Sequence, residues 1–190
     1  MPPMTFLDLT LRRQSDRGYS DRPVTREQID RCLEAARLAP SACNSQPWHF
    51  VVVKDKDKIK QLSKGVLIGE KLIGYYASNA FIQKAPVVIV ACANPHPITH
   101  TGGKLIGLDC LMLDIGIAVE HMVLTAAELG LGTCWLGYFS DKAARKILNI
   151  PAGTKVVAML SVGYPGEPSK LAEQRRKKLE EIYSVDVYKK

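Results

Sequence analysis

The stretch LDCLMLDIGIAVEHMVLTAAELG, residues 108–130, is long enough for a helix of about six turns and is apolar on nearly every side. A helix of this kind must be covered all round, which a chain of 190 residues achieves most readily with a second subunit. We therefore predict a core helix that ends at Gly130 and lies near a homodimer interface. No membrane span is expected, because the stretch carries the ionisable residues Asp109, Asp114, Glu120, His121 and Glu128.

Strand and helix patterns alternate on both sides of this helix. Buried strands are predicted for WHFVVV (48–53), PVVIVACA (86–93) and KVVAMLSVGY (155–164), where β-branched residues dominate. Capping boxes indicate helices over about 5–14 and from Thr25 to near Leu38, and helical patterns also cover 56–65, 70–84 and 140–148. The sequence thus predicts one α+β domain over residues 1–190, with a central mixed sheet flanked by helices.

Composition narrows the class of protein. Lys and Arg exceed Asp and Glu by seven, but no recognition helix, zinc finger or RNA-stacking signature accompanies the charge, so we expect no nucleic-acid partner. Two or three of these charges would suffice for an anionic small ligand. The five cysteines are widely spaced without a C-x-x-C pair, and the N-terminus has no secretion-signal pattern, so we expect a cytoplasmic protein.

Other kinds of site have weaker signals. Cys92, His96 and His100 are metal-ligand types, but prolines between them break any shared helical face, and we predict no metal. Ser41 and His49 lack the G-x-S-x-G turn of a hydrolytic triad. The glycines of GLGTC (130–134) end a helix instead of opening one, which excludes the dinucleotide fingerprint.

Two polar clusters are candidates for binding. Arg13, Ser15 and Arg17 alternate, so an extended backbone would direct the three side chains to one side, where they suit a phosphate or carboxylate. A solvated basic turn is the alternative. The loop PSACNSQPWHF (40–50) offers hydroxyl and amide donors for a planar polar ligand, and internal capping of the loop by Ser41 and Asn44 is its alternative.

Four segments in order resemble the nitroreductase family of flavin enzymes: RQSDR (13–17), PSACNSQPW (40–48), DIGIAVEHMVLTAAELGLGTCWLG (114–137) and VGYPGEP…RRKKLEE (162–181). The resemblance is colinear from Arg13 to Glu181. It implies a nitroreductase-like fold and an intertwined homodimer with FMN bound at the subunit interface. It also implies that a C-terminal segment over about 166–190 extends onto the partner subunit.

The same resemblance assigns the FMN contacts. The first cluster would meet the phosphate and flavin edge, the loop would reach across from the partner chain, backbone N–H groups would lie beside flavin N5, and C-terminal arginines would meet the phosphate. Asn79 and Lys84 are the nearest residues to a match for the pyrimidine edge. The residues so assigned are Arg13, Ser15, Arg17, Pro40, Ser41, Ala42, Asn44, Gln46, Leu136, Gly137, Tyr138, Arg175 and Arg176.

The activity implied by the resemblance is ping-pong hydride transfer from NADH or NADPH, through FMN, to a nitroaromatic, quinone or similar electron-poor acceptor. The flavin carries the redox chemistry, so no catalytic side chain is assigned. Alternatives are a non-catalytic flavin-binding or sensing protein, and a dehalogenase-like or flavin-destructase-like member of the same scaffold. The physiological acceptor and the choice between NADH and NADPH stay open.

Overall fold

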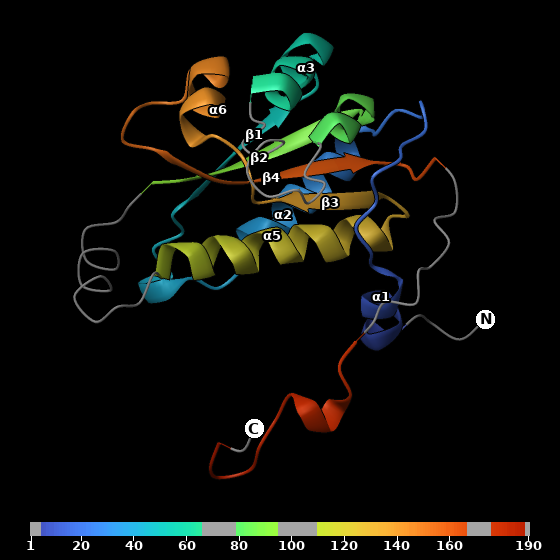
Figure 1. Cartoon of the computed structure of the whole chain (residues 1–190), viewed down its shortest axis with the longest axis vertical. Coiled ribbons are helices and arrows are strands. Elements are labelled where there is room, and N and C mark those ends of the chain that lie inside the picture. The colour runs from blue at the N-terminus through green and yellow to red at the C-terminus, as the bar shows by residue number, and fades with distance from the viewer. Residues whose placement is uncertain (1–4, 66–78, 95–109, 167–175, 189–190) are drawn as a thin grey trace, which may run out of the picture.

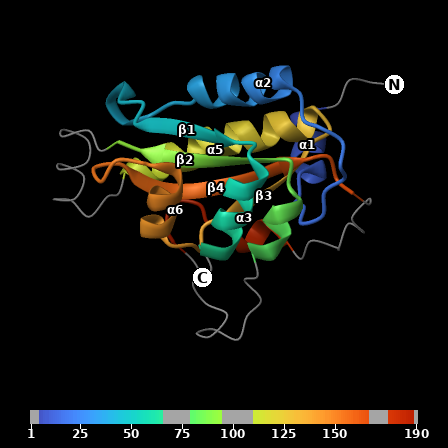
Figure 2. The same ribbon diagram turned by 90° about the horizontal axis from the view of Figure 1, so that it is seen from above.

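The computed structural model describes residues 5–65, 79–94, 110–166 and 176–188. A four-stranded sheet lies between two layers of helices (Figures 1 and 2). The strands are β1 (Trp48–Val53), β2 (Val87–Ala93), β3 (Gly132–Leu136) and β4 (Lys155–Gly163), in the order β1-β2-β4-β3. Their three ladders are antiparallel, and one parallel bridge joins Ser15 to Thr133. The predicted class, helices on a central sheet, is confirmed.

The helices divide between the two faces of the sheet. Helices α2 (Arg26–Arg37) and α5 (Cys110–Glu128) cover one face, and α3 (Lys56–Gly65) and α6 (Asp141–Leu148) cover the other (Figure 1). The two layers differ in charge. Helices α3 and α6 together carry seven Lys or Arg and two Asp, whereas α2 and α5 carry three Arg and six Asp or Glu.

Both predicted capping boxes form. The Thr5 hydroxyl accepts from the Asp8 N–H and the Thr25 hydroxyl from the Gln28 N–H, each at 3.2 Å, so both helices start where the sequence predicts. Helix α1 (Phe6–Arg12) ends earlier than predicted, because Arg13 is extended with φ −63° and ψ 125°. This early end starts an extended segment that runs along the edge of the sheet.

The sheet is most deeply buried at its centre. Every residue of β2 is buried, as predicted, and in β4 only Lys155 is not. The prediction that 48–53 forms a buried strand was wrong in one respect: only Val53 of β1 is buried. Within the described residues this strand lies at the edge of the sheet and pairs only with β2, a position that an apolar run does not reveal. Of the helix predicted over 70–84, residues 79–84 form the 3₁₀ helix η2 (Asn79–Lys84), and the rest lies outside the described residues.

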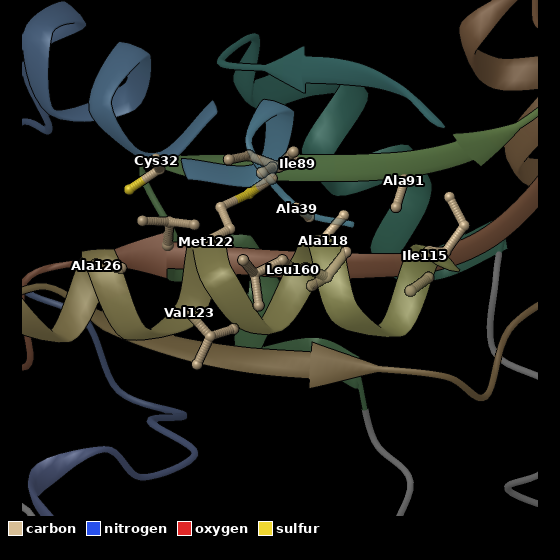
Figure 3. Packing of buried hydrophobic residues seen from close by; sticks show 14 of the residues in the cluster. Cys32, Ala39, Ile89, Ala91, Ile115, Ala118, Met122, Val123, Ala126 and Leu160 are labelled. Carbon is tan, nitrogen blue, oxygen red and sulfur yellow. The ribbon is translucent and has the colours of Figure 1, made fainter. Parts of the chain in front are cut away.

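Helix α5 is the core helix that the sequence predicts. Met122 and Ala118 lie between the helix and the sheet residues Ile89 and Leu160, with Cys32 of α2 alongside (Figure 3). By length and composition α5 could cross a membrane, but its packing is that of a core helix. At its end Gly130 has φ 73°, Leu131 N–H donates to Ala126 O and Gly130 N–H to Ala127 O, which is the predicted glycine cap.

One stripe of α5 is left uncovered within the chain. Met112, Leu113 and Ile117 are 42%, 54% and 39% exposed, although they are large and apolar. A contiguous apolar stripe on the central helix is typical of a surface that meets another protein.

Candidate functional site

The extended segment after α1 lies against the outer edge of β3. Asp16 N–H donates to Thr133 O at 2.8 Å, next to the parallel bridge between Ser15 and Thr133. Ser15 and Arg17 are exposed, Arg13 is half-buried, and Asp16 between them is buried. The expected alternation is present in part: Ser15 and Arg17 are exposed on either side of the buried Asp16, whereas Arg13 lies close to Asp16 and lines the same hollow.

A polar hollow of about 120 Å³ opens beside this segment. Two guanidinium groups face one carboxylate there, so the local charge favours an anion. The end of α5 closes the hollow from the other side. Its lining residues are Arg12, Arg13, Gln14, Asp16, Ala127, Gly130, Leu131, Thr133 and Pro165.

Helix η2 flanks the same segment. The guanidinium carbon of Arg17 lies 6.0 Å from the centre of the Phe81 ring, within the range of a cation–π contact. Asn79 and Lys84 stand at the two ends of this short helix. The short helix that contains these two residues, the nearest to a match for the pyrimidine edge, thus lies beside Arg17.

The loop after α2 has an unusual backbone. Cys43, Asn44 and Gln46 have φ of 51°, 52° and 43°, although none of them is glycine. Residues held in this sparsely populated region cluster at binding and catalytic sites. The Ser41 hydroxyl accepts from Gln46 N–H at 2.9 Å, and Asn44 Oδ1 accepts from Gln46 Nε2 at 3.1 Å. Within one chain, Ser41 and Asn44 therefore cap the loop internally, as the alternative interpretation predicts.

Asp114 of α5 anchors this loop. Its Oδ1 accepts a hydrogen bond from Ala42 N–H at 3.0 Å, and the residue is only 3% exposed. Within the described residues neither Asp114 Oδ2 nor the buried Ser45 hydroxyl has a hydrogen-bond partner. Buried polar atoms without partners are rare, so these two indicate where groups from a ligand or a second chain would fit.

The two clusters lie at opposite ends of α5. The loop is tied to Asp114, whereas the hollow beside Arg13 is closed by Ala127, thirteen residues further along the helix. At the usual helical rise this separation is about 20 Å. Figure 1 shows α1 and the loop after α2 at these two ends. One ligand can therefore meet both clusters only if the second cluster comes from another chain.

The end of β3 presents backbone groups at the sheet edge. In an antiparallel strand the N–H and C=O of one residue point to the same side, and the Thr133 carbonyl points outward to Asp16. By this alternation Leu136, the last residue of β3, faces its partner Met159 in β4. The other two predicted backbone donors, Gly137 and Tyr138, directly follow the strand.

The model of the nitroreductase family matches residues 10–164. The chain belongs to this family. It is 37% identical over 163 residues to an Archaeoglobus fulgidus protein whose provisional name is NADH dehydrogenase/NAD(P)H nitroreductase, covering 84% of each chain. These similarities support oxidoreductase chemistry for this nitroreductase-family chain.

Solved structures and a second group of relatives agree with this membership. The FMN-dependent nitroreductase from Clostridium difficile R20291 is 28% identical, with a TM-score of 0.77, and the match covers 96% of this chain and 100% of that one. Iodotyrosine deiodinase 1 of Rattus norvegicus is also 28% identical over 197 residues, covering 93% of this chain and 68% of the relative. The nitroreductase scaffold thus includes proteins named for different reactions.

The remaining predicted site residues lie partly outside the described chain. Arg175, His96 and His100 are outside it, and Arg176 is exposed at the start of the segment 176–188, which Figure 1 shows extending past α1 away from the sheet. Cys92 is fully buried, and burial raises the pKa of its thiol to about 11. Among the described residues, no group of three or more His, Cys, Asp or Glu side chains is placed to hold a metal ion.

Two residues of the candidate site were not singled out from the sequence. Asp16 appears there only within the RQSDR segment and Gly132 only within GLGTC, yet in the structure the Asp16 carboxyl group lies against Gly132. The ionisable residues of the 108–130 stretch did signal Asp114, since a carboxylate in an apolar helix needs a partner. Nothing in the sequence indicated that its partner would be the loop after α2.

Proposed function

We propose that this chain is an FMN-dependent oxidoreductase that accepts hydride from NADH or NADPH and reduces a nitroaromatic, quinone or similar electron-poor acceptor. The observation that carries the proposal is the extended 13–17 segment at the edge of β3, where Arg13 lines a polar hollow and Ser15 and Arg17 are exposed. Family membership supports the same conclusion.

The residues present fit a phosphorylated flavin. Two arginines and a serine on one short extended segment match the hydrogen-bonding needs of a phosphate dianion. Arg175 and Arg176 would add positive charge from the C-terminal segment. The loop residues Pro40, Ser41, Ala42, Asn44 and Gln46 would contact the flavin of the partner subunit.

A homodimer follows from the same placement. The exposed stripe of α5, the exposed Phe6, Leu7 and Leu11 of α1, and apolar residues of 176–188 together leave much apolar surface for a second copy to cover. In this arrangement residues 1–190 form one domain whose C-terminal segment, about 166–190, lies on the partner. The five cysteines are all free, which fits a reducing cytoplasm.

The chain contributes orientation and charge to the reaction. Bound FMN supplies the centre that takes up and passes on hydride. A backbone N–H group of Leu136, Gly137 or Tyr138, at the end of β3, would donate a hydrogen bond to the flavin. Arg13 and Arg17 would compensate negative charge on the phosphate and on the reduced ring.

The proposal is tested by the visible spectrum of the purified protein and by anaerobic stopped-flow mixing with NADH and NADPH. We expect a yellow protein whose flavin absorbance bleaches rapidly on mixing. A colourless protein that added FMN does not tint would refute the proposal. Bound flavin that fails to bleach with either nucleotide would favour the non-catalytic flavin-binding alternative.

Reductive dehalogenation is the second candidate, favoured by the 28% identity to iodotyrosine deiodinase 1 over 93% of the chain. The two candidates share the reduced flavin and differ in the acceptor. Turnover should be compared on a nitrofuran, a quinone and a halotyrosine with the same enzyme preparation. Faster turnover of the halotyrosine than of the other two would select dehalogenation.

A further inference from the structure

Asp16 is a buried carboxylate within the segment that carries the arginines. It is 7% exposed, and its Oδ1 accepts a hydrogen bond from Gln14 Nε2 at 3.1 Å. Because neighbouring side chains of an extended segment alternate, Asp16 points into the protein while Ser15 and Arg17 point out. Burying a carboxylate costs free energy unless hydrogen bonds or opposite charges compensate it.

The backbone of Asp16 is fixed from two directions. Its N–H donates to Thr133 O of β3 at 2.8 Å, and its carbonyl accepts from the Tyr19 hydroxyl at 2.8 Å. The Ser161 hydroxyl of β4 lies 2.6 Å from the same Tyr19 oxygen. The backbone of the segment is thus fixed to the sheet at Asp16.

Gly132 provides the space for the Asp16 side chain. A Cβ atom on Gly132 would lie 2.6 Å from Asp16 Oδ2 and 2.8 Å from Asp16 Cγ, distances that real Cβ atoms do not show. Any other residue at position 132 would therefore displace the carboxylate, and with it the segment that presents Arg13 and Arg17. The Asp16 side chain therefore fits at the edge of β3 only because position 132 has no side chain.

The charge of Asp16 bears directly on an anionic ligand. Burial raises the pKa of the Asp16 carboxyl group above its ordinary value, while the Gln14 hydrogen bond and the Arg13 charge oppose the rise. The residues at the end of α5 that line the hollow beside Asp16 carry no charge. The charged and titratable groups around Asp16 are Arg12, Arg13, Arg17, Tyr19 and Cys134.

We propose that Asp16 is a positioning residue for phosphate binding: seated against Gly132, it holds the 13–17 segment so that Arg13, Ser15 and Arg17 face the ligand together. Its ionised form places a negative charge next to Arg13, and its protonated form removes that charge. The affinity for FMN therefore tightens as the pH falls through the titration of Asp16. This inference rests on the proposed FMN-binding function.

The experiment measures FMN dissociation constants by flavin fluorescence for the wild type, Asp16→Asn and Gly132→Ala, from about pH 4 to about pH 8. Asp16→Asn keeps an acceptor for Gln14 and removes the charge. This variant should bind FMN at least as tightly as the wild type at neutral pH. It should lack the increase in FMN affinity that the titration of Asp16 causes as the pH falls. Titration of the FMN phosphate is common to both proteins, so the difference between the two profiles isolates Asp16.

Gly132→Ala should weaken FMN binding about tenfold, because the added methyl group displaces the carboxylate. The matched controls are Gly153→Ala, where an added Cβ meets nothing within 4 Å, and Asp21→Asn, an exposed carboxylate. Both should bind FMN as the wild type does. If thermal melting shows that Gly132→Ala does not fold, the Asp16→Asn profile decides alone.

Two results would overturn the inference and leave the proposed function standing: wild-type affinity in a folded Gly132→Ala protein, or identical pH profiles for Asp16→Asn and the wild type. A wild-type protein that binds no FMN at any pH would overturn both together.

Discussion

The two polar clusters of this protein are built in opposite ways. The 13–17 segment is extended and tied to β3 by a backbone hydrogen bond at 2.8 Å and a parallel bridge. The loop over 40–46 has three non-glycine residues with positive φ and is tied to α5 by the Asp114 carboxylate. One cluster is an extension of the sheet, and the other is a strained loop held at one point.

The difference indicates separate roles for the two clusters, which would be the two halves of the proposed FMN site. A segment fixed to the sheet is suited to charged groups that must not move, and a loop with a single side-chain anchor is suited to adjusting against a partner. Since the halves lie about 20 Å apart along α5, only a second chain can bring them together. The following predictions test this arrangement, beginning with the largest expected effect.

Leu113→Lys should separate the two halves. Leu113 is 54% exposed within the chain and lies on the stripe that the proposed dimer covers. An unpaired charge buried in an interface costs about 2 kcal/mol or more, so we expect dimer association at least about thirtyfold weaker. FMN affinity should fall with it, as measured by sedimentation and FMN titration of the same samples.

The control for this change is Gln61→Lys, an exposed substitution on α3 in the opposite layer, which should leave both measurements unchanged. A Leu113→Lys protein that stays dimeric and binds FMN normally would show that α5 is not at the interface.

Arg13→Ala removes a positive charge from the 13–17 segment. Hydrogen bonds to charged groups contribute about 1.5–3 kcal/mol, so FMN binding should weaken about ten- to hundredfold, with the dimer intact. Arg31→Ala is the matched control, because the Arg31–Glu128 ion pair at 3.5 Å joins exposed groups that contribute little. Equal FMN affinities in the two variants would contradict a phosphate-binding role for Arg13.

Asp114→Ala removes the carboxylate that ties the 40–46 loop to α5. Ala42 N–H then loses its acceptor, and an unsatisfied group in a partly buried site lowers the free energy of unfolding by about 1–3 kcal/mol. Asp114→Asn keeps an acceptor oxygen and should lose less stability. Urea unfolding of both variants makes the comparison, and equal losses would show that the loop does not depend on this hydrogen bond.

The smallest expected effect is a difference in the rate of thiol labelling between the 40–46 loop and the core. Cys43 is exposed, whereas Cys32 and Cys92 are buried and burial raises the pKa of both thiols to about 11. Raised pKa values keep these thiols protonated at neutral pH, so a thiolate-selective reagent should modify Cys43 first. FMN should slow the reaction of Cys43 if the loop meets the flavin, and Cys43→Ser should abolish the fast phase.

Much of the fold follows from local signals. Thr5 with Asp8, Thr25 with Gln28, and Gly130 each mark a helix end by a hydrogen-bonding requirement that depends on a few neighbouring residues. The edge position of β1 was not predictable, because an apolar run fits both a central and an edge strand. Strand order depends on long-range pairing that no local pattern encodes.

The candidate site was predictable only in part, for a similar reason. The spacing of Arg13, Ser15 and Arg17 predicts a shared side because an extended backbone alternates. The contact between Asp16 and Gly132 joins residues 116 positions apart and depends on the absence of a side chain, which a sequence pattern does not signal. The internal hydrogen bonds of Ser41 and Asn44 likewise require the turn geometry of the folded loop.

The uneven charge of the two helical layers has a kinetic consequence. A nicotinamide dinucleotide carries a negatively charged pyrophosphate, so the basic layer of α3 and α6 would speed its diffusional encounter with the protein, and the acidic layer of α2 and α5 would not. At about 0.1 M salt, such attraction is largely screened beyond about 10 Å. The bimolecular rate of flavin reduction should therefore fall with ionic strength, while reoxidation by an uncharged quinone should hardly change.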